Sequence, residues 1–242
     1  MKRVAGKRIK NRTKGKIWLP KTVEKPVEML PEKKPQPQPY SWEWYSQKAE
    51  QGDANAQYKL GEHYEYDDPE EAERWYRKAA EQNHVDAMRN LSLFYAQGDR
   101  YDEKESAKWL AKAAKLGDSV ALSELSIYST GKVLPADKEL EELYIREAQE
   151  DNPHAIYTLG CNYLYGMGGV LQNRDKAVVC LIEAAELEHE DAMYEVARCY
   201  ENGWGLHKDE NEAIYWYRVA VSYGNDMAKE RLQELGYEEE DW

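Results

Sequence analysis

A pattern that recurs every 31 to 37 residues constrains the fold of this chain more than any other feature. Most copies open with an alanine and continue, at near-fixed offsets, with a leucine or valine, a small residue and a tyrosine. The opening alanines are Ala56, Ala87, Ala121, Ala155, Ala192 and Ala228. Repeats of this length with apolar residues at helical spacing are typical of stacked helical hairpins, because one hairpin cannot bury both of its faces alone.

The second half of each copy carries a further pattern, Ala-x-x-Trp-Tyr followed by Ala-Ala, which is clearest over residues 72–80. We therefore predict two helices in each copy. Asp209 is a candidate N-cap for one of these second helices, and Gly224 stands where the chain leaves it, since glycine adopts the left-handed conformation without steric cost. Trp75 and Trp216 occupy equivalent places in the pattern, and we expect both to be buried between hairpins.

Together these patterns predict an all-α fold, a right-handed α-solenoid of about five helix-turn-helix repeats with capping helices at both ends. A half-unit precedes the first repeat, with Ser41 as its candidate N-cap and with Trp42 and Trp44 expected to cover the open end. A lone helix that ends at Gly236 follows the last repeat.

Three stretches match one known repeat pattern closely: residues 163–170 (Y-L-Y-G-M-G-G-V), 175–177 (D-K-A) and 75–80 (W-Y-R-K-A-A). On these motifs the chain resembles the Sel-one-like repeat (SLR) family, relatives of the tetratricopeptide repeat with a longer loop inside each hairpin. The resemblance spans about residues 41 to 235. It implies a helical-repeat adaptor or scaffold for protein complexes, and some bacterial members of the family neutralise partner toxins.

Three repeats depart from the family pattern. Residues 65–68 replace the glycine loop in the first repeat, the second keeps Gly98 alone, and the third has lost one residue between Leu125 and Gly131. We expect altered packing angles there. The glycine-rich stretch at 166–169 does not predict a nucleotide site, because no strand precedes it and no Gly-Lys-Ser/Thr follows it.

Charge divides the chain into two parts. Residues 1–40 contain 12 Lys or Arg and 3 Asp or Glu, a net charge of +9, whereas residues 41–242 contain 21 and 43, a net charge of −22. Such a basic tract cannot bury enough apolar surface to order itself, and a proline-rich tract favours an extended spacer. We predict a disordered basic arm over 1–21, a Pro-rich linker over 22–40, the solenoid over 41–236 and an acidic tail over 237–242.

The sequence also bears on location. It has no run of about 18 apolar residues that could span a membrane, and its first residues lack the apolar stretch of a secretory signal. We therefore expect a cytoplasmic protein. Cys161, Cys180 and Cys199 are an odd, sparse set at non-equivalent repeat positions, which predicts buried or partly buried free thiols rather than a disulfide framework.

Side chains that could carry chemistry do not form a recognisable constellation. The five histidines are His63, His84, His154, His189 and His207. No pair of them has the spacing of a helix-borne zinc site, and no cysteine pair stands two residues apart. We nominate no catalytic, cofactor-binding or metal-binding residue, and we expect a non-enzymatic protein without a cofactor.

Helical geometry nominates a binding surface instead. With the opening alanine counted as position 1, positions 1, 5, 6 and 9 share the buried arc, and positions 3 and 7 lie opposite. The nominated groove residues are Tyr58, Glu62, Arg89, Leu93, Tyr157, Cys161, Tyr194 and Arg198. Tetratricopeptide-like arrays line a concave groove with this face. We place its centre at Tyr157, Tyr194 and Arg198, since exposed tyrosine and arginine often anchor interfaces. The alternative is that the tyrosines pack against the preceding hairpin.

Three hypotheses for the function follow. The first is a scaffold or adaptor that binds a protein partner in the concave groove, and the second is an immunity-type inhibitor whose acidic body neutralises a basic enzyme or toxin. The third is nucleic-acid association through the basic arm, which the acidic body disfavours by repulsion. A simpler alternative is that the arm folds back on the acidic solenoid. We expect a monomer.

Overall fold

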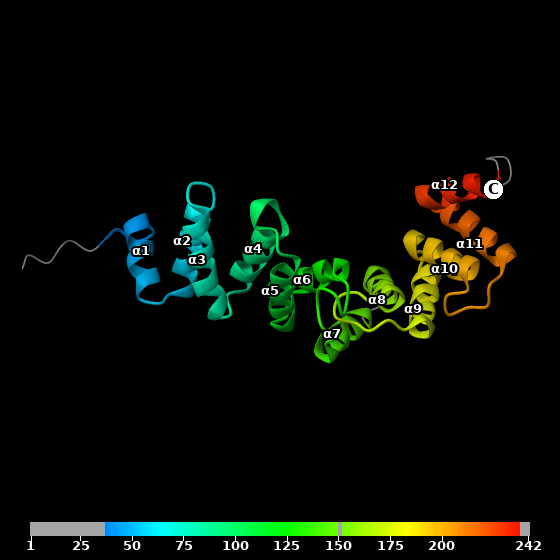
Figure 1. The fold of residues 1–242 in the computed structure, drawn as a ribbon, viewed down its shortest axis with the longest axis horizontal. Coiled ribbons are helices and arrows are strands. Elements are labelled where there is room, and N and C mark those ends of the chain that lie inside the picture. The colour runs from blue at the N-terminus through cyan, green and yellow to red at the C-terminus, as the bar shows by residue number, and fades with distance from the viewer. Residues whose placement is uncertain (1–36, 150–151, 238–242) are drawn as a thin grey trace, which may run out of the picture. The chain divides into compact units, whose positions relative to one another are not determined.

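The computed structural model describes residues 37–149 and 152–237, and all regular elements in these ranges are helices (Figure 1). The predictions for the basic arm, for linker residues up to 36 and for tail residues 238–242 lie outside these ranges. The α-helices are α1 (Trp42–Glu50), α2 (Ala54–Tyr64), α3 (Pro69–Glu81), α4 (Val85–Ala96), α5 (Glu103–Lys115), α6 (Ser119–Glu124), α7 (Lys138–Ala148), α8 (Pro153–Tyr165), α9 (Arg174–Glu186), α10 (Glu190–Asn202), α11 (Glu210–Ser222) and α12 (Asp226–Glu234). Two short 3₁₀ helices, η1 (Gly98–Arg100) and η2 (Leu125–Ile127), complete the set.

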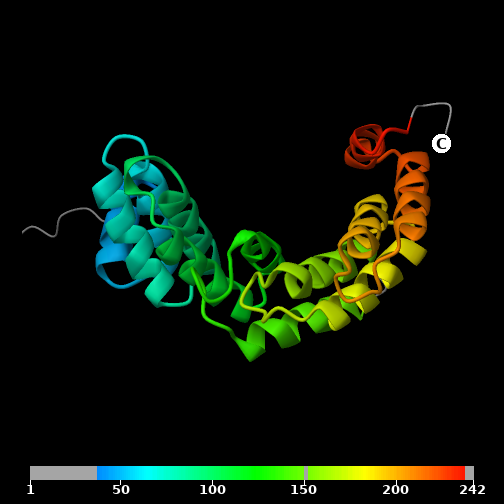
Figure 2. The same cartoon turned by 45° about the vertical axis from the view of Figure 1, so that its right-hand side comes forward.

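These helices form an α-solenoid. Helices α2 and α3, α4 and α5, α6 and α7, α8 and α9, and α10 and α11 form five successive hairpins, with α1 before the first and α12 after the last. Each hairpin packs on the next, and the stacking of α8 to α11 is clear in the turned view (Figure 2). The predicted all-α fold with capping helices is therefore confirmed. Within the described ranges, no helix is long and apolar enough to cross a membrane.

Side-chain caps fix where the helices start. The predicted N-caps are present: Ser41 accepts a hydrogen bond from the Trp44 amide (3.2 Å), and Asp209 accepts one from the Glu212 amide (3.2 Å). These caps satisfy amide groups that the first helical turn leaves without a partner. Helix boundaries in this chain are thus set largely by local sequence.

The small residue at position 6 lets the two helices of a hairpin approach closely. A Cβ atom added to Gly61 would lie 2.4 Å from the ring of Tyr76, and one added to Gly160 would lie 2.9 Å from the Leu181 side chain. The rings and branched side chains of the second helix occupy this space and are fully buried. One apolar core extends through the hairpins from α3 to α12, with a smaller cluster around Trp75 at the α1 end.

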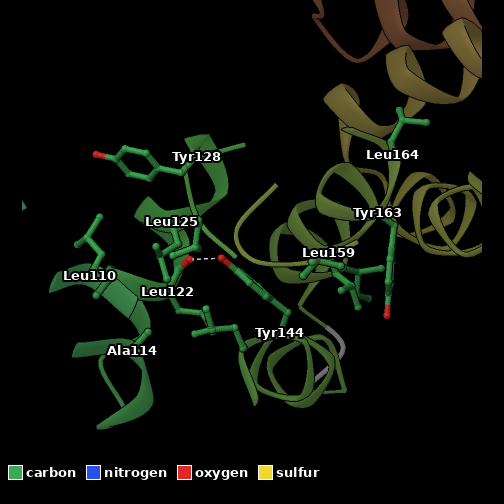
Figure 3. Packing of buried hydrophobic residues seen from close by; sticks show 14 of the residues in the cluster. Leu110, Ala114, Leu122, Leu125, Tyr128, Tyr144, Leu159, Tyr163 and Leu164 are labelled. Carbon is green, nitrogen blue, oxygen red and sulfur yellow. Dashed lines mark hydrogen bonds between the residues drawn. The ribbon is translucent and has the colours of Figure 1, made fainter. Parts of the chain in front are cut away.

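The irregular third hairpin keeps both of its helices, and the end of its first helix is wound more tightly. Helix α6 stops after six residues and continues as the 3₁₀ helix η2, whose smaller number of residues per turn accommodates the lost residue. Leu125 remains fully buried. Tyr144 of α7 donates a hydrogen bond to the Leu122 carbonyl over 2.6 Å and ties the two helices of this hairpin together (Figure 3).

The glycine loop of the fourth hairpin joins that hairpin to the third. The Thr130 amide donates to the Gly166 carbonyl (2.8 Å), and the Gly168 amide donates to the Tyr128 carbonyl (2.9 Å). Gly168 has a φ of 59°, and a Cβ there would lie 2.5 Å from the Tyr144 hydroxyl. The loop therefore needs glycine both for its left-handed backbone and for this close approach.

The prediction that Trp75 and Trp216 are both buried is right for the first and wrong for the second. Trp75 is 7% exposed, but Trp216 is only half-buried. Lys78, three residues after Trp75, places its ammonium 3.9 Å from the indole centroid, and Val219 stands at the equivalent place after Trp216. Valine has neither a long alkyl chain nor an ammonium, so it cannot make at Trp216 the contact that Lys78 makes at Trp75.

Candidate functional site

The eight nominated groove residues all reach the surface on the first helices of their hairpins. Leu93 is 54% exposed, and the other seven side chains are half-buried. We call the surface formed by positions 3, 7 and 11 of the first helices the first-helix face. Members of the face come together within each helix: the guanidinium of Arg198 lies 5.8 Å from the ring centroid of Tyr194, for example.

Position 3 contacts the start of the following hairpin. Tyr58 stacks on His84 with ring centroids 4.6 Å apart, and Tyr157 stacks on His189 at 4.5 Å. These two histidines are the N-caps of α4 and α10, where each accepts a hydrogen bond from a backbone amide. These tyrosines therefore contribute to the contact between successive hairpins. Each stacks on a residue of the following hairpin, whereas the alternative interpretation of the sequence placed them against the preceding one.

The same cap positions form a second set of contacts between hairpins. His84 Nε2 lies 3.1 Å from Asn55 Oδ1, His189 Nε2 lies 3.5 Å from His154 Nδ1, and Asn225 donates to Asp191 over 2.8 Å. In all three cases the cap residue of one first helix reaches the residue just before the opening alanine of the previous one. The sequence alone gave no role to these histidines, although their place immediately before a helix is typical of N-cap residues.

A polar network occupies the face between α8 and α10. Glu195 is buried, and its carboxylate accepts hydrogen bonds from the Tyr165 hydroxyl (2.5 Å) and from the Arg198 guanidinium (3.1 Å). The guanidinium also donates to the Tyr165 hydroxyl (2.8 Å) and lies 5.3 Å from the ring centroid of Trp204. Burial, followed by the hydrogen bond to Glu195, raises the pKa of Tyr165 well above its usual range. These intramolecular contacts fix the position of the Arg198 side chain.

Comparison with known proteins identifies the family of this chain. The Sel1 repeat profile matches residues 54–84, 85–118, 153–189 and 190–224. The chain belongs to the Sel1 repeat family. The four matches correspond to four of the five hairpins, and the unmatched interval contains the irregular α6–α7 pair.

Relatives of this Sel1 repeat chain include two curated proteins. It is 31% identical over 179 residues to the chitin synthase regulator SKT5 of Malassezia restricta, covering 69% of this chain and 12% of that protein. It is 28% identical over 196 residues to the uncharacterized protein NMB1327 of Neisseria meningitidis, covering 78% of this chain and 41% of that protein. The chain therefore spans less than half the length of either relative.

The fold is also found among solved structures. The crystal structure of a Sel1 repeat protein from Oxalobacter formigenes matches with a TM-score of 0.53 and 28% sequence identity. The match covers 81% of this chain and 60% of that one. The likeness supports the solenoid arrangement and assigns no partner.

The cysteines of the Sel1 repeats are free thiols, as predicted, with Cys199 buried and Cys161 and Cys180 half-buried. Burial raises the pKa of the Cys161 and Cys199 thiols to about 12 and that of Cys180 to about 11. Thiols with such values stay protonated at neutral pH and are poor nucleophiles and metal ligands. Within residues 37–149 and 152–237, no group of three or more His, Cys, Asp or Glu is placed to hold a metal ion.

Two large exposed apolar or aromatic members of the first-helix face were missed by sequence reasoning. Ile127 is 69% exposed at position 7 of the third hairpin, and Tyr165 is 39% exposed at position 11 of the fourth. The third repeat was left out of the nominated set because its spacing is irregular. Counting forward six residues from the opening alanine, Ala121, identifies Ile127.

The cap at His189 gives the Sel1 array a dependence on pH. Burial lowers the pKa of His189 from its ordinary value near 6.5, against the charges of Asp191 and Glu190, which raise it, and the neighbouring His154 adds a smaller lowering effect. The folded protein therefore favours the neutral imidazole, whose Nδ1 accepts the Ala192 amide. Its contribution to stability is complete above about pH 6.5 and is lost as the pH falls below that value.

Replacing His189 by asparagine is expected to reduce this acid sensitivity. Asparagine already serves as the equivalent cap at Asn152 and Asn225, so the helix start is retained while the titrating group is removed. Thermal unfolding measured at intervals between pH 7.5 and 5 should show a smaller loss of stability in H189N than in the wild type. Parallel pH profiles of the two proteins would contradict this role for His189.

Proposed function

We propose that this chain is a non-enzymatic scaffold or adaptor that binds a protein partner along the first-helix face. Sel1 repeat proteins generally mediate protein–protein interactions. The observation that carries the proposal for this chain is the exposure of Leu93 and Ile127, at 54% and 69%, on position 7 of consecutive hairpins. We take these two side chains to belong to one apolar patch, and contiguous exposed apolar patches mark interaction surfaces.

Aromatic and polar residues of the same face support a binding role over a catalytic one. The side chains of Glu195, Arg198 and Tyr165 bond to one another, and Tyr157 stacks on a helix cap. Such contacts hold side chains in fixed positions, which lowers the entropic cost of binding a partner. We include Tyr157, Tyr194 and Arg198 in the proposed surface, with Leu93 and Ile127 as its exposed apolar members.

A relative's name agrees with an adaptor role. The Malassezia protein is named as a regulator of an enzyme, chitin synthase, and a regulator acts by binding. This chain matches 12% of that protein, so the shared property we propose is partner binding and not a particular target.

The alternative proposal is an immunity-type inhibitor that neutralises a basic partner enzyme or toxin. It is favoured by the charge of residues 41–242, which contain 43 acidic and 21 basic residues. A surface of this sign accelerates encounter with a basic protein and makes the association rate salt-dependent. It also disfavours nucleic acid as a ligand of the solenoid.

Charged substitutions on the exposed part of the face test the proposal. The double variant L93E/I127E is expected to reduce recovery of co-purifying proteins by about tenfold, since a buried unpaired carboxylate opposes an apolar interface. The matched control V179E/Y215E changes two side chains on second helices that are similarly exposed, at 65% and 58%.

Quantitative mass spectrometry of proteins retained by the wild type and by both variants provides the measurement. Loss of the same partner from L93E/I127E alone supports the first-helix face. Loss from the control alone, or equal retention by all three proteins, overturns it. Inhibition of the recovered partner's activity by the wild-type chain would select the inhibitor over the scaffold.

A further inference from the structure

A cleft of about 480 Å³ opens between the first and second hairpins. One side is the loop that joins α2 to α3, and the other is the end of α4 with η1. The lining residues used below are Glu65, Tyr66, Leu93, Phe94, Asp99 and Arg100. Leu93 belongs to the first-helix face, so the cleft is continuous with the surface proposed above.

Apolar side chains line the cleft and are open to solvent. Tyr66 is 89% exposed and Leu93 is 54% exposed, although both are large side chains. Phe94, the only phenylalanine of the chain, is half-buried beside them. An aliphatic or aromatic side chain of a partner would therefore exchange water for apolar contact on several sides.

Carboxylates surround this apolar lining. Glu65 and Asp99 line the cleft itself, the loop that contains Glu65 adds Asp67 and Asp68, and the first turn of α3 adds Glu70 and Glu71. The one cation among the lining residues, Arg100, lies with its guanidinium over the ring of Phe94 at 5.1 Å and 3.8 Å from Glu70. Glu70 therefore partly offsets the charge of Arg100, and acidic side chains outnumber basic ones around the cleft.

The sequence explains why the cleft occurs here. Residues 65–68 replace the glycine loop of the family pattern, and the loop after α4 keeps a single glycine, Gly98, which has a φ of 71°. In the fourth hairpin, the intact loop buries Val170 fully against the preceding hairpin. The two shortened loops leave the corresponding space open.

We infer that this cleft binds a basic segment of the partner protein that carries an apolar anchor residue. The anchor lies against Leu93 and Phe94, and the flanking lysine or arginine side chains meet Asp67 and Asp99. The exposed ring of Tyr66 offers a cation–π contact to one of these cations. An acidic peptide or a nucleic acid would bring like charge to the same rim. This inference rests on the proposed function and specifies the chemistry of the partner.

The test uses the full chain and a synthetic fluorescein-labelled peptide with a central Trp-Leu pair flanked by lysines on both sides. Two matched peptides serve as controls: one replaces Trp-Leu by Ser-Ser, and the other replaces the lysines by glutamates. Fluorescence anisotropy is expected to show saturable binding of the first peptide, with both control peptides bound at least about tenfold more weakly.

Protein variants then locate the binding. Y66A/L93S is expected to weaken binding by about tenfold, and D67N/D99N is expected to weaken it and to reduce its dependence on salt. Y215A is the control, because Tyr215 is an exposed tyrosine on α11, outside the cleft, with an exposure of 58%. Circular dichroism of each variant verifies that it is folded.

Equal binding of the Ser-Ser peptide, equal binding of the Glu peptide, or equal binding by Y66A/L93S and the wild type would each overturn the inference. The outcome is separable from that of the proposed function. If the peptide fails to bind this cleft while L93E/I127E still loses its partner, the first-helix face remains a binding surface and only the basic-anchor chemistry is wrong.

Discussion

Replacing Trp75 by alanine is expected to lower the free energy of unfolding by about 3–5 kcal/mol, whereas replacing Trp216 by alanine should cost only about 1–2 kcal/mol. Trp75 is 7% exposed and packs against Ala49, Ala56 and Leu60 of the two preceding helices. Its removal leaves a cavity between hairpins. Trp216 is half-buried, so its removal exposes less new apolar surface and leaves a space that solvent already enters.

Urea unfolding followed by far-ultraviolet circular dichroism measures both losses. W75F is the control for Trp75, because phenylalanine keeps most of the ring contacts and removes an indole N–H that has no hydrogen-bond partner. We expect W75F to cost less than half as much as W75A. Equal losses for W75A and W216A would show that the burial of each indole does not set the cost of removing it.

Replacing Arg198 by alanine is expected to cost about 2–3 kcal/mol, because it leaves the buried carboxylate of Glu195 without its charged partner. The side chain of Glu195 is 9% exposed, and that of Arg198 is 31% exposed. The Tyr165 hydroxyl would remain as a donor to the carboxylate, but it carries no positive charge. The effect is therefore larger than for an ordinary surface arginine.

A second substitution separates the charge from the packing of Arg198. In E195Q/R198A the buried group is neutral and can still accept the Tyr165 hydroxyl, so we expect it to recover a substantial part of the lost stability. A double variant no more stable than R198A would contradict a charge-pair role. Partner affinity of any Arg198 variant must be compared at equal folded fraction, since this residue contributes to both stability and the proposed surface.

Local signals made the fold predictable from the sequence. The opening alanines, the small residue at position 6 and the caps at Ser41 and Asp209 each act through neighbours a few residues away or through the partner helix of the same hairpin. That is why the number of hairpins and the helix starts are confirmed. The cysteines were also predictable as free thiols, since their spacing matches no metal or disulfide pattern.

Features that depend on contacts between hairpins were less accessible. The burial of Trp216 was predicted from its repeat position, but the two tryptophans have different neighbours: Lys78 lies over Trp75, and Val219 takes the equivalent place after Trp216. His189 caps a helix and stacks on Tyr157 of the previous hairpin, and the glycine loop at 166–169 bonds to the third hairpin. In each case the contacting residue belongs to another repeat, about one repeat away in the sequence. The position of a residue within its own repeat does not reveal such a contact.

The candidate face was predictable in direction but not in detail. Helical periodicity placed the eight nominated residues on one side of the first helices, and in the structure Leu93 is exposed and the other seven are half-buried. Periodicity could not show that Arg198 is engaged by Glu195, nor that Ile127 is the most exposed apolar residue on this face. Both depend on how the fourth and fifth hairpins, and the shortened α6, are packed.

The central claim, that a partner binds the first-helix face, is tested most directly by site-specific photocrosslinking. A photoreactive amino acid placed at Ile127 samples the face, and the same residue placed at Val179 samples an equally exposed second helix, the two positions being 69% and 65% exposed. The account predicts a covalent adduct to the same partner from position 127 and none from position 179. Adducts from position 179 alone, or equally from both positions, would contradict it.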